Sequence, residues 1–121
     1  MEFPIQASPS LLYQYLSTPS GLSEWFADNV NSRGKMFTFI WDGSEEKAEI
    51  ITKKNGERIK LKWLEDEDTD AFFEMRIQVD AITKDVSLIV TDFAESKNTV
   101  EEGQMFWENM IEELKQILGS A

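Results

Sequence analysis

The chain has 121 residues, a length that fits one domain with a single hydrophobic core. It carries 23 acidic and 12 basic residues, which give a formal net charge of −11 at pH 7. Such a charge repels phosphate backbones and anionic lipid headgroups, so we expect neither nucleic acid nor membrane surfaces as partners. The chain contains neither cysteine nor histidine. Disulfides, thiolate nucleophiles, imidazole catalysis and the common zinc sites are therefore excluded.

No segment predicts export or insertion into a membrane. The apolar runs are too short to span a bilayer, and the opening residues "MEFPIQ" lack a basic region followed by an apolar one. No internal repeat, low-complexity tract or linker divides the sequence. We therefore expect one cytoplasmic domain that covers residues 1–121.

The first expected elements are a strand and two short helices. The segment "EFPIQ" alternates in polarity and predicts a strand over residues 2–6. Ser8 and Thr18 are each followed by proline, which is typical of an N-cap residue followed by the first helical position. We expect helices over residues 9–17 and 19–27.

From Lys35 onward, apolar residues recur with a period of two, which predicts antiparallel strands joined by turns. Asn55 and Gly56 form the dipeptide typical of a two-residue hairpin turn, in which both residues adopt positive φ. The dipeptide "DG" and the tripeptide "TKD" predict two further turns. The expected strands cover residues 35–41, 47–53, 58–63, 71–79 and 86–93.

The last expected element is a long amphipathic helix over about residues 100–118. Thr99 and Glu102 fit a capping box at its start, and Gly119 stands at its end. Its apolar stripe follows helical spacing and consists of Trp107, Met110, Ile111, Leu114, Ile117 and Leu118. A sheet and a helix that each have one apolar face satisfy each other by packing together. We therefore expect an α+β fold in which a curved antiparallel sheet wraps around the terminal helix.

Two segments resemble a known superfamily. The segment "IQASPSLLYQYLSTPSGLSEWFA" resembles the opening of the START-like helix-grip (SRPBCC) superfamily. The segment "EEGQMFWENMIEELKQIL" resembles the terminal helix of its branch related to the C-terminal domain of heat-shock chaperone ATPase activators. The resemblance implies a helix-grip fold with a cavity under the two short helices. Members of this superfamily include lipid carriers, hormone receptors, cyclases and chaperone regulators, so the fold alone fixes no single activity.

The aromatic pair Trp25 and Phe26 has two interpretations. One or both rings close the mouth of the cavity, or they only anchor a short helix to the sheet. Phe106 stands where the chaperone-related branch usually has glycine, so its ring occupies space that a ligand would use elsewhere. The other apolar candidates either line a cavity or fill the core. They are Phe37, Phe39, Trp41, Leu61, Trp63, Met75, Ile77, Leu88, Val90, Trp107 and Met110.

Asp92 is the one acidic candidate for the cavity. The period of two places it on the same face as Leu88 and Val90, where an inward carboxylate would need a partner. The other interpretation is that Asp92 lies at the exposed end of the strand or caps a turn.

An acidic run, "EDEDTD", imitates the first ligands of a calcium loop through Asp66, Asp68 and Asp70. The match then fails, because Ala71 stands where the loop needs glycine and Ile77 where it needs a bidentate glutamate. We therefore expect a solvated hairpin loop here, with no metal ion and no cofactor.

Two functional hypotheses follow. The first is a non-catalytic binding module with an apolar cavity for a small hydrophobic or lipid-like ligand. The alternative is a protein-interaction module of the co-chaperone-regulator type, with the cavity filled. An enzymatic function is the weaker hypothesis, because no acid–base pair identifies itself.

Overall fold

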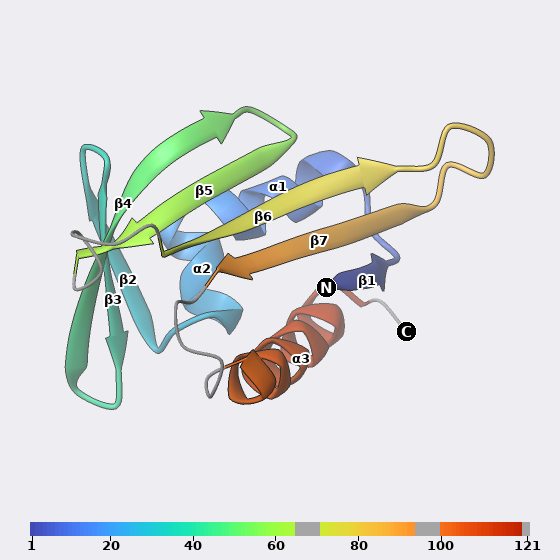
Figure 1. The fold of residues 1–121 in the computed structure, drawn as a ribbon. Coiled ribbons are helices and arrows are strands. Elements are labelled where there is room, and N and C mark those ends of the chain that lie inside the picture. Colours follow the sequence, from blue (N-terminus) through green and yellow to red (C-terminus); the bar gives the residue numbers. More distant parts are fainter. Residues whose placement is uncertain (65–70, 94–99, 120–121) are drawn as a thin grey trace.

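The computed structural model describes residues 1–64, 71–93 and 100–119 (Figure 1). These residues form seven strands and three helices. In chain order the elements are β1 (Glu2–Ile5), α1 (Pro9–Ser17), α2 (Pro19–Trp25), β2 (Asn29–Arg33), β3 (Met36–Trp41), β4 (Ser44–Lys54), β5 (Arg58–Trp63), β6 (Phe72–Val79), β7 (Val86–Phe93) and α3 (Val100–Ile117).

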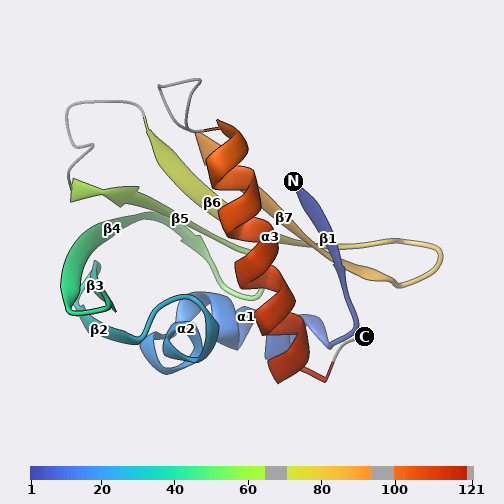
Figure 2. The same cartoon turned by 90° about the horizontal axis from the view of Figure 1, so that it is seen from below.

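The strands form one antiparallel sheet in the order β1-β7-β6-β5-β4-β3-β2. The first strand closes one edge by pairing with β7, and the amino group of Met1 donates a 2.9 Å hydrogen bond to the carbonyl oxygen of Val90. Figure 2 shows α3 crossing the curved sheet. Helix α1 packs against β5 and β6, and α2 packs against β2 and α3. The predicted α+β helix-grip architecture is confirmed.

The buried side chains lie between the sheet and the three helices. Trp107, Ile111 and Leu114 of α3 belong to one continuous core with Ile59 and Leu61 of β5. Their spacing explains the placement, because period-two residues share one face of a strand and residues three or four apart share one face of a helix. None of the helices in the described ranges is long and apolar enough to cross a membrane.

The two short helices begin as their caps predict. Ser8 Oγ accepts a 3.2 Å hydrogen bond from the amide of Leu11, and Thr18 Oγ1 accepts one of 3.0 Å from the amide of Gly21. The two helices then come so close that a Cβ on Gly21 would meet the carbonyl oxygen of Gln14 and lie 2.7 Å from Cα of Tyr15. Glycine is therefore required at this helix contact.

Two local features differ from expectation. Strand β2 was not predicted, because Val30 is its only buried residue and an apolar alternation is missing. The predicted two-residue turn is wrong, since Lys54 pairs with Arg58 across a three-residue loop. Within the described chain, Gly56 is the only residue of that loop with positive φ. The longer loop spares Asn55 the left-handed conformation that a two-residue turn requires.

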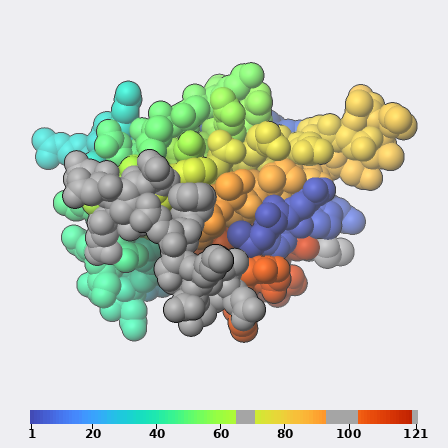
Figure 3. Space-filling model, in the orientation of Figure 1, coloured from blue at the N-terminus to red at the C-terminus, as the bar shows by residue number. Residues whose placement is uncertain are grey.

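Two predicted features lie outside the described residues. The calcium-like run occupies residues 66–70, and the capping box depends on residue 99 and on the side chain of residue 102. The hairpin between β6 and β7 projects beyond the body of the domain (Figure 3). Its turn lies within the described chain.

Candidate functional site

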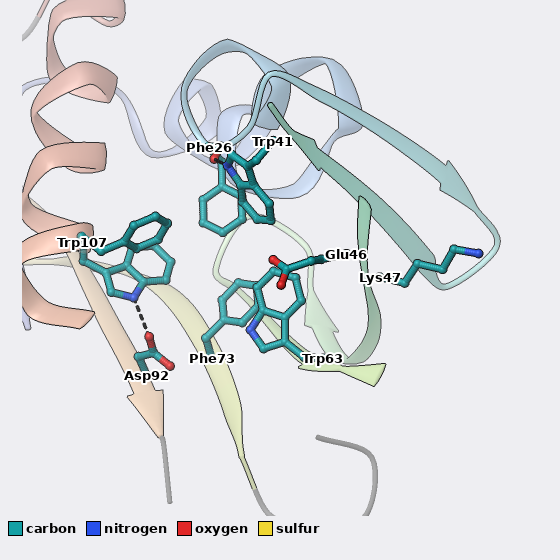
Figure 4. A pocket seen from close by; sticks show the side chains of 9 residues that line it. Phe26, Trp41, Glu46, Lys47, Trp63, Phe73, Asp92 and Trp107 are labelled. Carbon is teal, nitrogen blue, oxygen red and sulfur yellow. Dashed lines mark hydrogen bonds between the residues drawn. The ribbon is translucent and has the colours of Figure 1, made fainter. Parts of the chain in front are cut away.

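A pocket of about 340 Å³ opens between the sheet and α3, beside the end of α2 (Figure 4). Its described lining consists of Phe26, Trp41, Glu46, Lys47, Trp63, Phe73, Asp92, Phe106 and Trp107. Aromatic rings thus supply most of the lining side chains, and they come from α3, from the residue after α2 and from β3, β5 and β6.

Phe26 lies at the centre of the aromatic cluster. It follows directly after α2, is only 1% exposed, and its ring centroid lies 5.8 Å from that of Phe73 and 5.6 Å from that of Trp107. Trp41 Nε1 donates a 2.7 Å hydrogen bond to the carbonyl oxygen of Phe26. This bond fixes the indole of Trp41 on β3 against the end of α2, so the helix end and the strand together position this side of the pocket.

Trp25 has a different role from its neighbour. Its Nε1 donates a 2.8 Å hydrogen bond to the carbonyl oxygen of Tyr15, and its side chain is buried. This bond ties α2 to α1 and turns the indole away from the pocket lining. The structure therefore separates the two adjacent aromatics, with Phe26 at the pocket and Trp25 as an anchor between helices.

A second group of rings forms the wall on β5 and β6. Trp63 and Phe73 stack with ring centroids 5.2 Å apart, and the centroids of Trp41 and Trp63 are 6.0 Å apart. Phe73 is buried, whereas both of these indoles remain partly exposed. The pocket thus combines a buried aromatic floor with walls that reach solvent.

Phe106 lies at the edge of the pocket. It is 44% exposed and meets Trp107 edge-on, with ring centroids 6.0 Å apart. The ring therefore borders the space and does not fill it. Phe106 was expected to occupy space at the pocket. It does lie at the pocket, but it leaves the space open.

Two carboxylates complete the lining. Asp92 Oδ2 accepts a 2.8 Å hydrogen bond from Trp107 Nε1, although the aspartate as a whole is exposed. Both earlier interpretations of Asp92 thus hold in part, since it lies near the strand end and also borders the pocket. Glu46 pairs with Phe39, so it shares the concave face of the sheet. Figure 4 shows its carboxylate beside the rings of Trp41 and Trp63, whereas the side chain of Lys47 points away from them.

The sequence matches the model of the START-like superfamily domain over residues 1–120. The chain belongs to the START-like superfamily. Domains of this superfamily are often ligand-binding modules. Among curated protein sequences, none is significantly similar to this chain.

Several solved structures share the fold of this START-like domain. A Bacteroides fragilis protein solved by NMR is 28% identical, with a TM-score of 0.68 over 97% of this chain and 87% of the other. The Aha1 dimer from Colwellia psychrerythraea is 15% identical, with a TM-score of 0.79 over 98% and 92% of the two chains. CalU16 from Micromonospora echinospora is 16% identical, with a TM-score of 0.76 over 96% and 70%. The last two likenesses show the fold alone.

The pocket of this START-like domain brings together some of the predicted cavity residues. Phe26, Trp41, Trp63, Asp92, Phe106 and Trp107 line it. Phe37, Phe39, Leu61, Met75, Ile77, Leu88 and Val90 are buried in the core outside this lining, as is Trp25, and Met110 packs against the core from its edge.

Sequence reasoning missed Phe73, Glu46 and Lys47 as lining residues. Phe73 shares the buried face of its strand with Met75, so the period of two was sufficient to find it. Glu46 was missed because the strand was expected to begin one residue later. Counting back two from the buried Ala48 places Glu46 on the concave face.

Proposed function

We propose that this START-like domain is a non-catalytic binding module whose aromatic pocket takes up one small, mainly hydrophobic molecule. The observation that carries the proposal is the pocket of about 340 Å³ in the concave side of the sheet. Ligand pockets in proteins are typically roughly 300–1,000 Å³ and mainly apolar. A pocket of this size suits a single small aromatic or short-chain molecule.

The exposure of the wall residues supports the same function. Trp41, Trp63 and Phe106 all leave part of their rings in contact with solvent around the same space. Apolar surface in water is unfavourable by about 25 cal/mol per Å², so a ligand that covers these rings gains free energy. Large exposed aromatic groups gathered at one concave site are typical of binding surfaces.

The four tryptophans provide an internal test of the proposal. Trp41, Trp63 and Trp107 line the pocket, whereas Trp25 does not. Titration with neohexylbenzene, a neutral apolar molecule, should shift the indole N–H signals of the three lining residues in the NMR spectrum. The signal of Trp25 should move least, because its indole lies outside the pocket lining and is bonded to the backbone of α1.

A matched pair of variants separates the pocket from the rest of the surface. Trp63→Leu removes a partly exposed ring from the wall, and we expect neohexylbenzene to bind roughly tenfold more weakly. Phe72→Leu removes a partly exposed ring on the opposite face of β6, where Lys60 lies 4.0 Å from its centroid. This control variant should bind the ligand like the native protein.

If neither neohexylbenzene nor a second apolar probe, Nile red, shifts the lining indoles in a saturable way, the binding proposal is contradicted. The alternative function, a protein-interaction module of the co-chaperone-regulator type, would then lead. Affinity capture with the folded domain would be the next experiment for that alternative.

A further inference from the structure

We infer that the pocket selects ligands that carry an organic cation, such as an alkylammonium or quaternary ammonium group, on an apolar body. The inference rests on the proposed function and names the chemical class of its ligand. The arrangement behind it is a cluster of aromatic faces with the carboxylates of Glu46 and Asp92 at its border.

The aromatic part of this arrangement suits a cation. Tryptophan presents the most negative ring face among the side chains and attracts ammonium groups within about 6 Å of the ring. The ring planes of Trp41 and Trp63 are inclined by 51°, so they bound the space from two directions. Phe73 stacks with Trp63 and supports that indole from the buried floor of the pocket. A quaternary ammonium group can contact several such faces at once, since its charge is spread over methyl groups.

The two carboxylates give the border of the pocket a negative charge. The indole N–H of Trp107 orients Asp92 by donating a hydrogen bond to Oδ2. Both carboxylate oxygens of Asp92 can accept further hydrogen bonds. Glu46 lies on a different strand, and in Figure 4 the rings of Phe73 and Trp63 lie between the two acids. Among the described residues, neither carboxylate forms an ion pair with a lysine or an arginine. Within the described chain, both carboxylates therefore keep their charge for a cation brought by the ligand.

The one lysine of the described lining does not neutralise this negative charge. Lys47 pairs with Thr38 on the convex face, and Figure 4 shows its ammonium group far from the rings. The formal net charge of −11 also raises the concentration of cations near the surface. The same field opposes fatty acids and other carboxylate ligands, so the lipid-like class expected from the sequence narrows to neutral and cationic molecules.

Three ligands that share a phenethyl group test the inference. They are phenethyltrimethylammonium, its neutral isostere neohexylbenzene, and the anion phenylbutanoate. We expect the ammonium compound to bind roughly tenfold more tightly than the isostere, and the anion to bind most weakly. The affinity of the ammonium compound should also fall as salt is added, because partly exposed charges are screened.

Conservative variants locate the effect. Glu46→Gln and Asp92→Asn should each weaken binding of the ammonium compound by roughly threefold, and should weaken it more than they weaken binding of the neutral isostere. Asp92→Asn retains an oxygen acceptor for Trp107. Glu45→Gln is the matched control, because it makes the same change one residue away, where the side chain pairs with Ile40 on the convex face. It should alter neither affinity.

Each outcome decides a separate point. Equal affinity for the ammonium compound and its neutral isostere overturns the cation inference and leaves the proposed function intact. Equal weakening by Glu45→Gln and Glu46→Gln also overturns it, because the general field of the protein would then explain the preference. If neither the three ligands nor Nile red shift the lining indoles in a saturable way, the proposed function fails and the inference fails with it.

Discussion

The indole Nε1 of Trp107 donates a 2.8 Å hydrogen bond to Oδ2 of Asp92 and so ties α3 to the end of β7. The tryptophan side chain is 2% exposed, whereas the aspartate reaches solvent. The bond satisfies the polar atom of a buried ring at the point where the helix meets the sheet. It also places both side chains at the border of the same pocket. The contact that orients the helix thus also shapes the candidate site.

Replacing Trp107 with alanine should reduce the free energy of unfolding by about 3–5 kcal/mol, because it removes a large buried ring from the helix–sheet contact. Trp107→Phe keeps a ring but loses the donor to Asp92, and its cost should be smaller. Denaturant-induced unfolding, followed by circular dichroism, measures both. A loss below about 1 kcal/mol for Trp107→Ala would mean that the ring is not part of the core.

Gly21→Ala should destabilise the domain by about 1–3 kcal/mol, because the new methyl group would meet the backbone of α1. Gly103→Ala is the matched control in α3. Its Cβ would have ordinary contact only, 3.9 Å from Asp92 Oδ2, and alanine favours a helix over glycine by about 0.5–1 kcal/mol. Thermal unfolding should therefore show a lower midpoint for the first variant and a higher one for the second. A midpoint for Gly21→Ala at or above the native value would refute the close helix contact.

Trp25→Phe should separate stability from binding. The variant loses the hydrogen bond to the carbonyl oxygen of Tyr15, which should cost about 1–2 kcal/mol of unfolding free energy. Its affinity for neohexylbenzene should stay within about twofold of the native value, because the indole is outside the pocket lining. A tenfold loss of affinity in a folded variant would assign Trp25 to the pocket after all.

The fold was predictable because burial follows periodicity in each long element. Ile59 and Leu61 alternate with Lys60 in β5, and Trp107, Ile111 and Leu114 recur at helical spacing in α3. Strand β2 escaped prediction because one buried residue makes no pattern. A short edge strand that pairs on one side obtains its structure from its neighbour β3 and not from its own sequence.

The candidate site was harder to predict because it depends on where elements end. Helix α2 ends at Trp25, so Phe26 becomes the residue that turns its ring into the pocket. Adjacent aromatics carry the same sequence signal, and only the geometry of the helix end assigns their different roles. The inward direction of Glu46 likewise depends on strand register, which places it opposite Phe39. A charged residue beside a turn reads as solvent-exposed until that register is known.

The turn between β6 and β7 predicts a dependence of stability on pH. Asp80 Oδ1 accepts hydrogen bonds from the amides of Thr83, at 2.9 Å, and Ile82, at 2.8 Å. These two bonds lower the pKa of Asp80 below its ordinary value, and the bond from Thr83 contributes most. Because the bonds favour the carboxylate, the folded pKa lies below the unfolded one. The stabilisation is then complete above the unfolded pKa and is lost as the pH falls through the folded pKa.

Asp80→Asn tests this dependence, since it retains an oxygen acceptor in the turn but removes the charge that strengthens the two bonds. The native protein should be more stable than the variant at neutral pH, and the difference should shrink as the solution is made acidic. Denaturant unfolding of both proteins across this range measures the difference, and the carboxyl signal of Asp80 in NMR should titrate below the usual aspartate value. A stability difference that is constant, or that grows on acidification, would show that the amides of the turn do not favour the ionised carboxylate.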